Sequence, residues 1–224
     1  MGPFLATDFD GPQLDDILAV HRLYGDVNEE GSGNENYLDS TSIGRFWPGQ
    51  SVTLGSDAAD TVVDFGDTDF VSIDDDSATD CYRFTVLAPS IIDLDLTPLG
   101  PTYLEGPQGG TQTPFNTAFQ SDLSLTLWDR DGTTILGSSN DNGLGGSETV
   151  DELFLFEPGD YYVSVDGAQN AAQFYELDLN LSAPFPGTPN FFEIVVRDFA
   201  RRAGFGRFFG NNPVHGTFIL PEPS

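Results

Sequence analysis

YELDLNL, residues 175–181, alternates apolar and polar side chains over its whole length. In an extended chain successive side chains point to opposite faces. One face of this stretch is therefore apolar, and the other carries Glu176, Asp178 and Asn180. This period of two predicts a β-strand with one face in the core and one face in water.

Four other stretches repeat this pattern. Their apolar positions are Tyr82, Phe84 and Val86; Ile92, Leu94 and Leu96; Leu123, Leu125 and Leu127; and Tyr161, Val163 and Val165. Turn-forming pairs such as Asp131-Gly132 and Asp166-Gly167 separate the stretches. Many short strands in series predict an all-β fold, an antiparallel two-layer β-sandwich or jelly roll over residues 69–182. The side chains expected to point inward are Tyr82, Phe84, Leu94, Leu125, Leu127, Val163, Val165, Leu177 and Leu179.

The sequence before this region has a different period. In residues 11–25, GPQLDDILAVHRLYG, the residues Leu14, Ile17 and Leu18 lie close to one stripe of an α-helix, and Gly25 can end it. A single helix of this length is marginal in water, so the stripe needs a partner surface. Residues 26–50 are rich in Gly, Asn, Ser and Glu, which predicts a linker between the helix and the strands.

The composition restricts the function. The chain has 224 residues, 36 acidic against 8 basic, and a formal net charge of −28. Such a field repels nucleic acid and anionic membranes, so we expect neither as a partner. A single cysteine, Cys81, excludes an internal disulfide framework. No apolar run reaches the ~18 residues of a membrane span, and Met1-Gly2-Pro3 does not open a signal peptide, so an exported chain would need further residues before Met1.

The first 25 residues resemble the end of a matrixin-type metzincin catalytic domain. Met1-x-Pro3 matches the Met-turn of that family, and Asp15-Asp16-Ile17 with Leu23-Tyr24-Gly25 matches its last helix. The resemblance implies that residues 1–25 are the C-terminal remnant of a zinc protease domain. It also implies that Met1 is an internal methionine that supports the metal site structurally without being a ligand.

The zinc site itself is missing from this sequence. Metzincins bind zinc through H-E-x-x-H-x-x-G-x-x-H, with the Glu as general base. The chain has two histidines, His21 and His215, far apart and outside any such motif. His21 is expected to pack against a neighbour or face solvent. We therefore predict no catalytic residues here, with zinc bound only by a catalytic portion upstream of this chain.

Residues 51–182 resemble the bacterial pre-peptidase C-terminal domain, a jelly-roll-like sandwich found behind many secreted proteases. The resemblance depends on Asp80-Cys81-Tyr82-Arg83-Phe84 as an opening strand, on residues 122–132 as a central hairpin, and on the late strands at residues 159–165 and 175–177. Cys81 is expected to be a small buried hydrophobe. The insertion at residues 100–119 is longer than a hairpin needs, which is typical of a functional loop.

Four carboxylates crowd the turn before that opening strand: Asp74, Asp75, Asp76 and Asp80. Calcium takes six to eight oxygen ligands, and a group of carboxylates can supply them while relieving its own repulsion. The sequence therefore makes these four residues a candidate calcium site. A solvated acidic loop without a metal explains the same pattern, and the sequence does not decide between the two.

Residues 183–224 contain a second linker, a candidate short amphipathic helix, and a Pro-Glu-Pro ending. The segment after residue 190 holds Arg197, Arg201, Arg202 and Arg207, half of the positive charge of the chain. It can pack on the acidic sandwich or lie on a membrane surface. Residues 219–224, ILPEPS, resemble the start of a Pro-Glu-Pro C-terminal sorting signal, but the apolar helix and arginine cluster that follow in that family are missing.

These observations predict a non-catalytic accessory module of a secreted or cell-surface zinc metalloendopeptidase, active in binding, folding or localisation. Its expected partners are the upstream catalytic domain of the same polypeptide and an extracellular protein or polysaccharide. The alternative is a free-standing, calcium-stabilised surface adhesion or structural module. The reading frame before Met1 separates the two, because the histidine motif should lie there.

Overall fold

The computed structural model describes residues 13–29, 33–59, 63–107 and 109–184. The chain divides into two compact units, Met1–Pro184 and Phe185–Ser224, and all described residues lie in the first. The predicted Met-turn at Met1, the arginine-rich segment with its candidate helix, and the Pro-Glu-Pro ending lie outside the described residues.

The described residues form one α-helix, twelve strands and two 3₁₀ turns. The helix is α1 (Leu14–Tyr24), and the strands are β1 (Thr41–Phe46), β2 (Gln50–Leu54), β3 (Ser72–Ile73), β4 (Thr79–Val86), β5 (Ser90–Leu99), β6 (Thr102–Glu105), β7 (Thr113–Asn116), β8 (Leu123–Trp128), β9 (Ile135–Ser139), β10 (Glu148–Leu155), β11 (Gly159–Gly167) and β12 (Gln173–Ser182). The 3₁₀ turns are η1 (Ser56–Ala59) and η2 (Thr117–Phe119).

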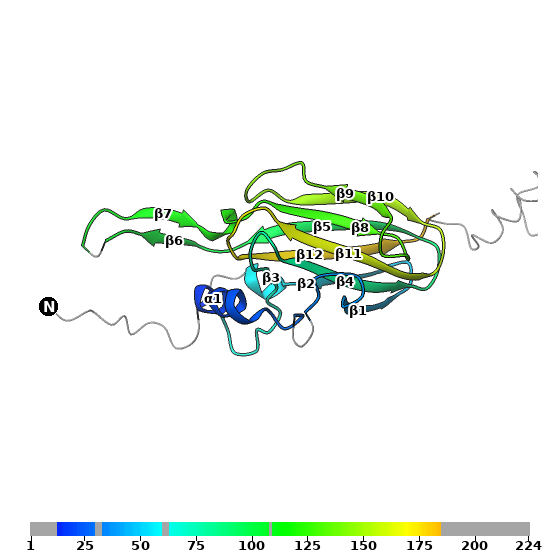
Figure 1. Ribbon diagram of the computed structural model, residues 1–224, viewed down its shortest axis with the longest axis horizontal. Helices are drawn as coiled ribbons and strands as arrows, with labels where there is room; N and C mark the ends of the chain where they lie inside the picture. Colours follow the sequence, from blue (N-terminus) through cyan, green and yellow to red (C-terminus); the bar gives the residue numbers. More distant parts are fainter. Residues whose placement is uncertain (1–12, 30–32, 60–62, 108, 185–224) are drawn as a thin grey trace, which may run out of the picture. The chain divides into compact units, whose positions relative to one another are not determined.

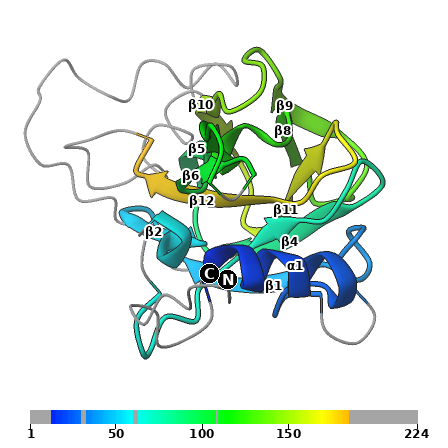
Figure 2. The same ribbon diagram turned by 90° about the vertical axis from the view of Figure 1, so that its left-hand side faces the viewer.

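The strands build two five-stranded sheets and a separate hairpin. Sheet A has the order β1-β4-β11-β8-β9, and sheet B has the order β10-β5-β12-β2 with β3 also paired to β12. All strand pairs among the described residues are antiparallel except β1 with β4. Figures 1 and 2 show the two sheets as stacked layers. The predicted all-β sandwich is thus confirmed.

The core lies between the sheets, where the alternating strands place their apolar faces. The nine side chains predicted to point inward are each at most 1% exposed and belong to one apolar cluster. Full burial of each aliphatic or aromatic side chain contributes about 1.5–3 kcal/mol relative to exposure. Two fully buried tyrosines of this core share a hydrogen bond, because the hydroxyl oxygens of Tyr82 and Tyr175 are 2.7 Å apart.

Helix α1 finds its partner surface on the sandwich. Leu14 is buried with Phe70 and Phe174 in a second apolar cluster, and Ile17 and Leu18 pack against it. The ring of His21 meets that of Phe174 edge-on at 5.8 Å. The helix therefore lies at the end of the sandwich beside β3, the same end from which the β6–β7 hairpin projects (Figure 1).

The predicted linker at residues 26–50 contains a strand of the sandwich. Thr41–Phe46 forms β1, which extends sheet A by pairing with β4, and β2 already begins at Gln50. Asp26 and Asn34 are buried. The strand escaped detection because its apolar alternation is broken at Gly44, where the pairing register also shifts. The 100–119 insertion, by contrast, forms a hairpin of β6 and β7 with Leu104 and Phe115 exposed.

We predict that Leu125→Ala lowers the free energy of unfolding by about 2–5 kcal/mol, since Leu125 is fully buried on β8 and the substitution leaves a cavity. Urea unfolding followed by circular dichroism measures the change. Leu104→Ala is the matched control, because Leu104 is 67% exposed on β6 and should change stability little. Equal losses in both variants would contradict the packing described here.

Candidate functional site

The structure separates the four aspartates predicted as calcium ligands. Asp76 is exposed, and Asp75 lies near the surface, where its Oδ1 accepts hydrogen bonds from the Ser77 backbone N–H at 2.7 Å and the Ser77 hydroxyl at 2.6 Å. Those bonds lower the pKa of Asp75. Asp80 is fully buried, and Asp74 is partly buried. Only the last two face the interior side of the loop.

The carboxylates of Asp74 and Asp80 interact electrostatically with those of Asp26 and Glu29. We call these four residues, together with the buried Asn34, the acidic cluster: Asp26, Glu29, Asn34, Asp74 and Asp80. The first three come from the segment that follows α1, in the range expected to be a linker. Asn34 is held beside β4 because its carbonyl accepts a hydrogen bond from the Cys81 backbone N–H at 2.8 Å. Asp26 is held beside β3, where its Oδ2 accepts from the Ser72 backbone N–H at 3.2 Å.

Local turn chemistry fixes the shape of this segment. The Asp26 carboxylate accepts a hydrogen bond from the Asn28 backbone N–H at 2.6 Å, and the Asp26 backbone N–H donates to Glu29 Oε2 at 2.7 Å. Asp and Asn side chains commonly close such turns on their own backbone. The carboxylates of Asp26 and Glu29 therefore both stabilise the turn at residues 26–29 and are held in place by it.

Several polar atoms of the cluster are buried without hydrogen bonds from the described residues. They are Asn34 Oδ1 and Nδ2, Asp74 Oδ1 and Asp80 Oδ1. The other oxygen of Asp80 accepts a hydrogen bond from the Tyr175 hydroxyl at 2.5 Å. A buried charged oxygen without a partner is costly, so the cluster favours either protons or a cation on these carboxylates.

The pKa values of the cluster reflect that cost. Burial raises the pKa of Glu29 to about 7 and that of Asp74 to about 6, with neighbouring carboxylates adding to both shifts. Burial also raises the pKa of Asp26, and it raises that of Asp80 well above its usual range, where repulsion from Asp26 adds to the shift. The cluster thus binds protons in the folded state more strongly than the unfolded chain does.

The donor chemistry of the cluster suits a hard cation. Carboxylate and amide oxygens are the ligands that calcium prefers. As they stand, however, no three His, Cys, Asp or Glu side chains in the described ranges form a ready metal-binding group. A cation would have to draw these oxygens together. The sequence missed Asp26, Glu29 and Asn34 because they lie in a Gly-rich stretch, although their acid and amide side chains were a usable signal.

A serine and a histidine meet nearby without forming a nucleophilic site. His21 Nδ1 lies 2.9 Å from Ser72 Oγ. Ser72 is fully buried, so a substrate cannot reach its hydroxyl. Burial lowers the pKa of His21, which favours the neutral ring between Ser72 and Phe174. The expected packing role for His21 agrees with these contacts.

The fold and the cluster define a β-sandwich module with a buried acidic group under its N-terminal segment. Comparison with known proteins found no matching family model and no matching curated protein. No helix in the described ranges is long and apolar enough to cross a membrane.

Among solved structures, the chain is similar to a pre-peptidase C-terminal domain of a collagenase from Bacillus anthracis, at 16% identity and a TM-score of 0.35. That match covers 63% of this chain and 96% of the other. It is also similar to a β-glucosidase from Paenibacillus barengoltzii, at 14% identity and a TM-score of 0.31, covering 69% of this chain and 12% of the enzyme. At these values neither comparison assigns a function or a site.

The raised pKa values predict how stability depends on pH in a chelating buffer. Glu29 and Asp74 hold protons up to about 7 and about 6 when folded, against ordinary values of 4.5 and 3.8. Their contribution is fully present below the unfolded values and is lost as pH rises through the folded ones. We therefore expect the midpoint of thermal unfolding to fall between about pH 5 and about pH 8.

The matched control is the double variant Glu29→Gln, Asp74→Asn, whose midpoint should depend less on pH across the same range. His21 acts in the opposite direction, because its lowered pKa makes protonation unfavourable in the folded state, and its effect is common to both proteins. An identical pH profile for the parent and the double variant would show that these carboxylates do not carry the effect.

Proposed function

We propose that this chain is a non-catalytic accessory module of a secreted or cell-surface zinc metalloendopeptidase. The observation that carries this proposal is the docking of α1, the segment that resembles the end of a metzincin domain, on the end of the sandwich. Leu14 packs with Phe70 and Phe174 there. Arg22 adds a hydrogen bond from its Nη2 to Asn170 Oδ1 at 2.6 Å.

That docking gives the module a physical means of holding a catalytic domain. A helix of this length is marginal alone, so the sandwich supplies the surface that keeps α1 folded. A catalytic domain connected to the N-terminal end of α1 would then be tethered close to the sandwich. The module would fold, position or retain the enzyme, and an extracellular protein or polysaccharide would be a second partner.

Calcium is the second part of the proposal. Of the four aspartates expected from the sequence, we assign the role to Asp74 and Asp80, joined by Asp26, Glu29 and Asn34. All are oxygen donors, and four of their buried side-chain atoms have no hydrogen bond from the described residues. A divalent cation would offset the mutual repulsion of the carboxylates and join the segment after α1 to β4.

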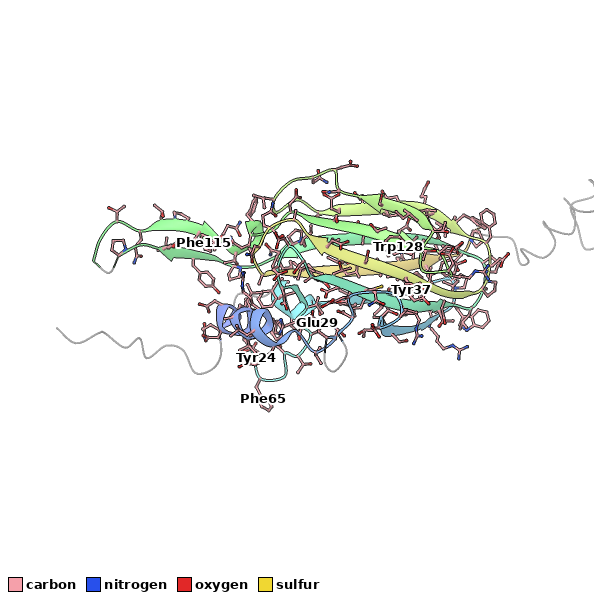
Figure 3. The ribbon with its side chains drawn as sticks, viewed as in Figure 1. Tyr24, Glu29, Tyr37, Phe65, Phe115 and Trp128 are labelled. Carbon is pink, nitrogen blue, oxygen red and sulfur yellow. The ribbon has the colours of Figure 1, made fainter. Side chains whose placement is uncertain are left out.

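A second candidate function is a free-standing, calcium-stabilised surface adhesion or structural module. The β6–β7 hairpin favours it, because this two-stranded ribbon stands out from the sandwich and carries exposed Leu104 and Phe115 (Figures 1 and 3). Exposed apolar side chains on a projecting element are typical of an interaction surface. The reading frame before Met1 separates the two candidates, since only the first requires a histidine zinc motif there.

We expect calcium to stabilise the fold beyond the effect of ionic strength. If calcium binds only the folded chain, free ion at about 100 times its dissociation constant adds about 2.7 kcal/mol to the free energy of unfolding. Thermal unfolding in calcium and in sodium at equal ionic strength separates binding from general screening. Asp74→Asn should remove the calcium-specific part, whereas Asp76→Asn, at an exposed position, should keep it. Equal responses to both salts would favour a solvated acidic loop.

We expect the purified chain to have no zinc-dependent protease activity, because its two histidines cannot form the three-histidine site of a metzincin. Casein and gelatin cleavage, with and without a chelator, tests this. Joining the upstream reading frame to the chain should restore chelator-sensitive cleavage if the proposed parent is correct. Specific cleavage by the chain alone, surviving stringent purification, would refute the assignment.

A further inference from the structure

A concave site lies on the outer face of sheet A, and its lining side chains are not members of the acidic cluster. It is a pocket of about 280 Å³ between the sheet and the loop that precedes β1. Its floor is formed by Cys81 of β4 and Ser164 of β11, both buried. Its remaining lining residues are Glu35, Asn36, Tyr37, Thr79, Trp128, Gly132 and Asp166.

Two aromatic side chains wall the pocket. Tyr37 comes from the loop and Trp128 from the end of β8, and both are labelled in Figure 3. Tyr37 is fixed by an edge-on contact with Tyr162 at 5.7 Å, and the indole N–H of Trp128 donates to Ser164 Oγ at 3.0 Å. Gly132 permits this arrangement, because a Cβ there would lie 2.4 Å from the Tyr37 ring. The aromatic walls are therefore held in place.

Three side-chain hydrogen-bond donors of the lining are engaged inside the protein. Trp128 donates to Ser164, the Thr79 hydroxyl donates to Asp166 Oδ1 at 2.5 Å, and the Asn36 amide donates to Asp39 at 3.1 Å. The acceptors remain: Asp166 has a second carboxylate oxygen, and Glu35 is exposed at the rim with no hydrogen bond from the described residues. The pocket thus offers carboxylate oxygens and aromatic rings.

Such a lining is complementary to a group that only donates and carries positive charge. A guanidinium has five N–H donors, no acceptor and a planar face that stacks on aromatic rings. Cations are attracted to Tyr and Trp faces and form charge-assisted bonds to carboxylates. The volume is near the lower end of small-molecule pockets, which suits one side chain. The net charge of −28 also steers a basic partner toward this surface.

We propose that this pocket binds the guanidinium of an arginine side chain presented by a basic protein partner. The proposal identifies a partner class for the module and does not depend on the calcium site or on a parent protease. Failure of the binding test below would leave the calcium and protease tests unaffected, so the outcomes are distinguishable.

The test uses the fluorescence of Trp128. The chain has two tryptophans, and Trp47→Phe removes the other, which is 57% exposed and does not line the pocket. In this background N-acetyl-arginine methylamide should change the emission in a saturable way. Its uncharged isostere N-acetyl-citrulline methylamide should bind at least about fivefold more weakly, and added salt should weaken arginine binding.

Single substitutions locate the site. Glu35→Gln and Asp166→Asn should each weaken arginine binding about fivefold, the size expected for one partly exposed charge pair. Asp160→Asn is the matched control: Asp160 accepts from Thr85 across the same two strands, β11 and β4, just as Asp166 accepts from Thr79, but outside the pocket. This variant should bind like the parent.

Three results would overturn the proposal. The first is no saturable change with the arginine probe up to its solubility limit. The second is equal binding of the citrulline isostere or of an uncharged methyl glycoside, which would indicate a polar or saccharide ligand. The third is equal affinity of the Glu35, Asp166 and Asp160 variants, which would place any binding elsewhere on this acidic surface.

Discussion

Burial of the Asp80 carboxyl at the end of the sandwich is the constraint on which much of the structure depends. Asp80 is the first inward-facing residue of β4, on the same side of the strand as Tyr82 and Phe84. The Tyr175 hydroxyl satisfies one oxygen, and no described residue satisfies the other. Asp26, Glu29 and Asp74 lie close enough to this end for their charges to raise the pKa of Asp80 further. The end of the core is therefore covered by groups that repel one another unless a proton or a cation intervenes.

The apolar packing of helix α1 opposes that repulsion by holding the N-terminal segment on the sandwich. Its buried stripe anchors the segment on Phe70 and Phe174, while His21 and Asp26 both contact Ser72 of β3. Apolar burial involves no titrating group, whereas the carboxylates next to it gain and lose protons with pH. The N-terminal segment is thus attached both by apolar packing and by carboxylates whose charge depends on pH. In a chain with so large a net negative charge, this is where we expect stability to respond first to cations.

Periodicity predicted the sandwich well because burial imposes it directly. Every strand with a clean two-residue alternation, such as those containing Leu125 and Leu177, lies where expected with its apolar face inward. Strand β1 was missed because it pairs at a sheet edge and is interrupted by Gly44, so its sequence carries little alternation. The sequence singled out Asp74 and Asp80 of the acidic cluster but not Asp26, Glu29 or Asn34. Carboxylates adjacent in sequence, Asp75 and Asp76, stay near the surface, while Asp26 and Glu29 reach the site through tertiary packing that no local spacing encodes.

One short segment lines both sites. Asp26, Glu29 and Asn34 belong to the acidic cluster, and Glu35 and Tyr37, which follow closely in the chain, line the pocket on the outer face of sheet A. The same division occurs on β4, where Asp80 points inward and Cys81 points outward because successive side chains of a strand alternate. The hydrogen bond from the Cys81 N–H to the Asn34 carbonyl joins β4 to the segment that precedes β1. The acidic cluster and the pocket are therefore neighbours along the chain, and each uses its own set of side chains.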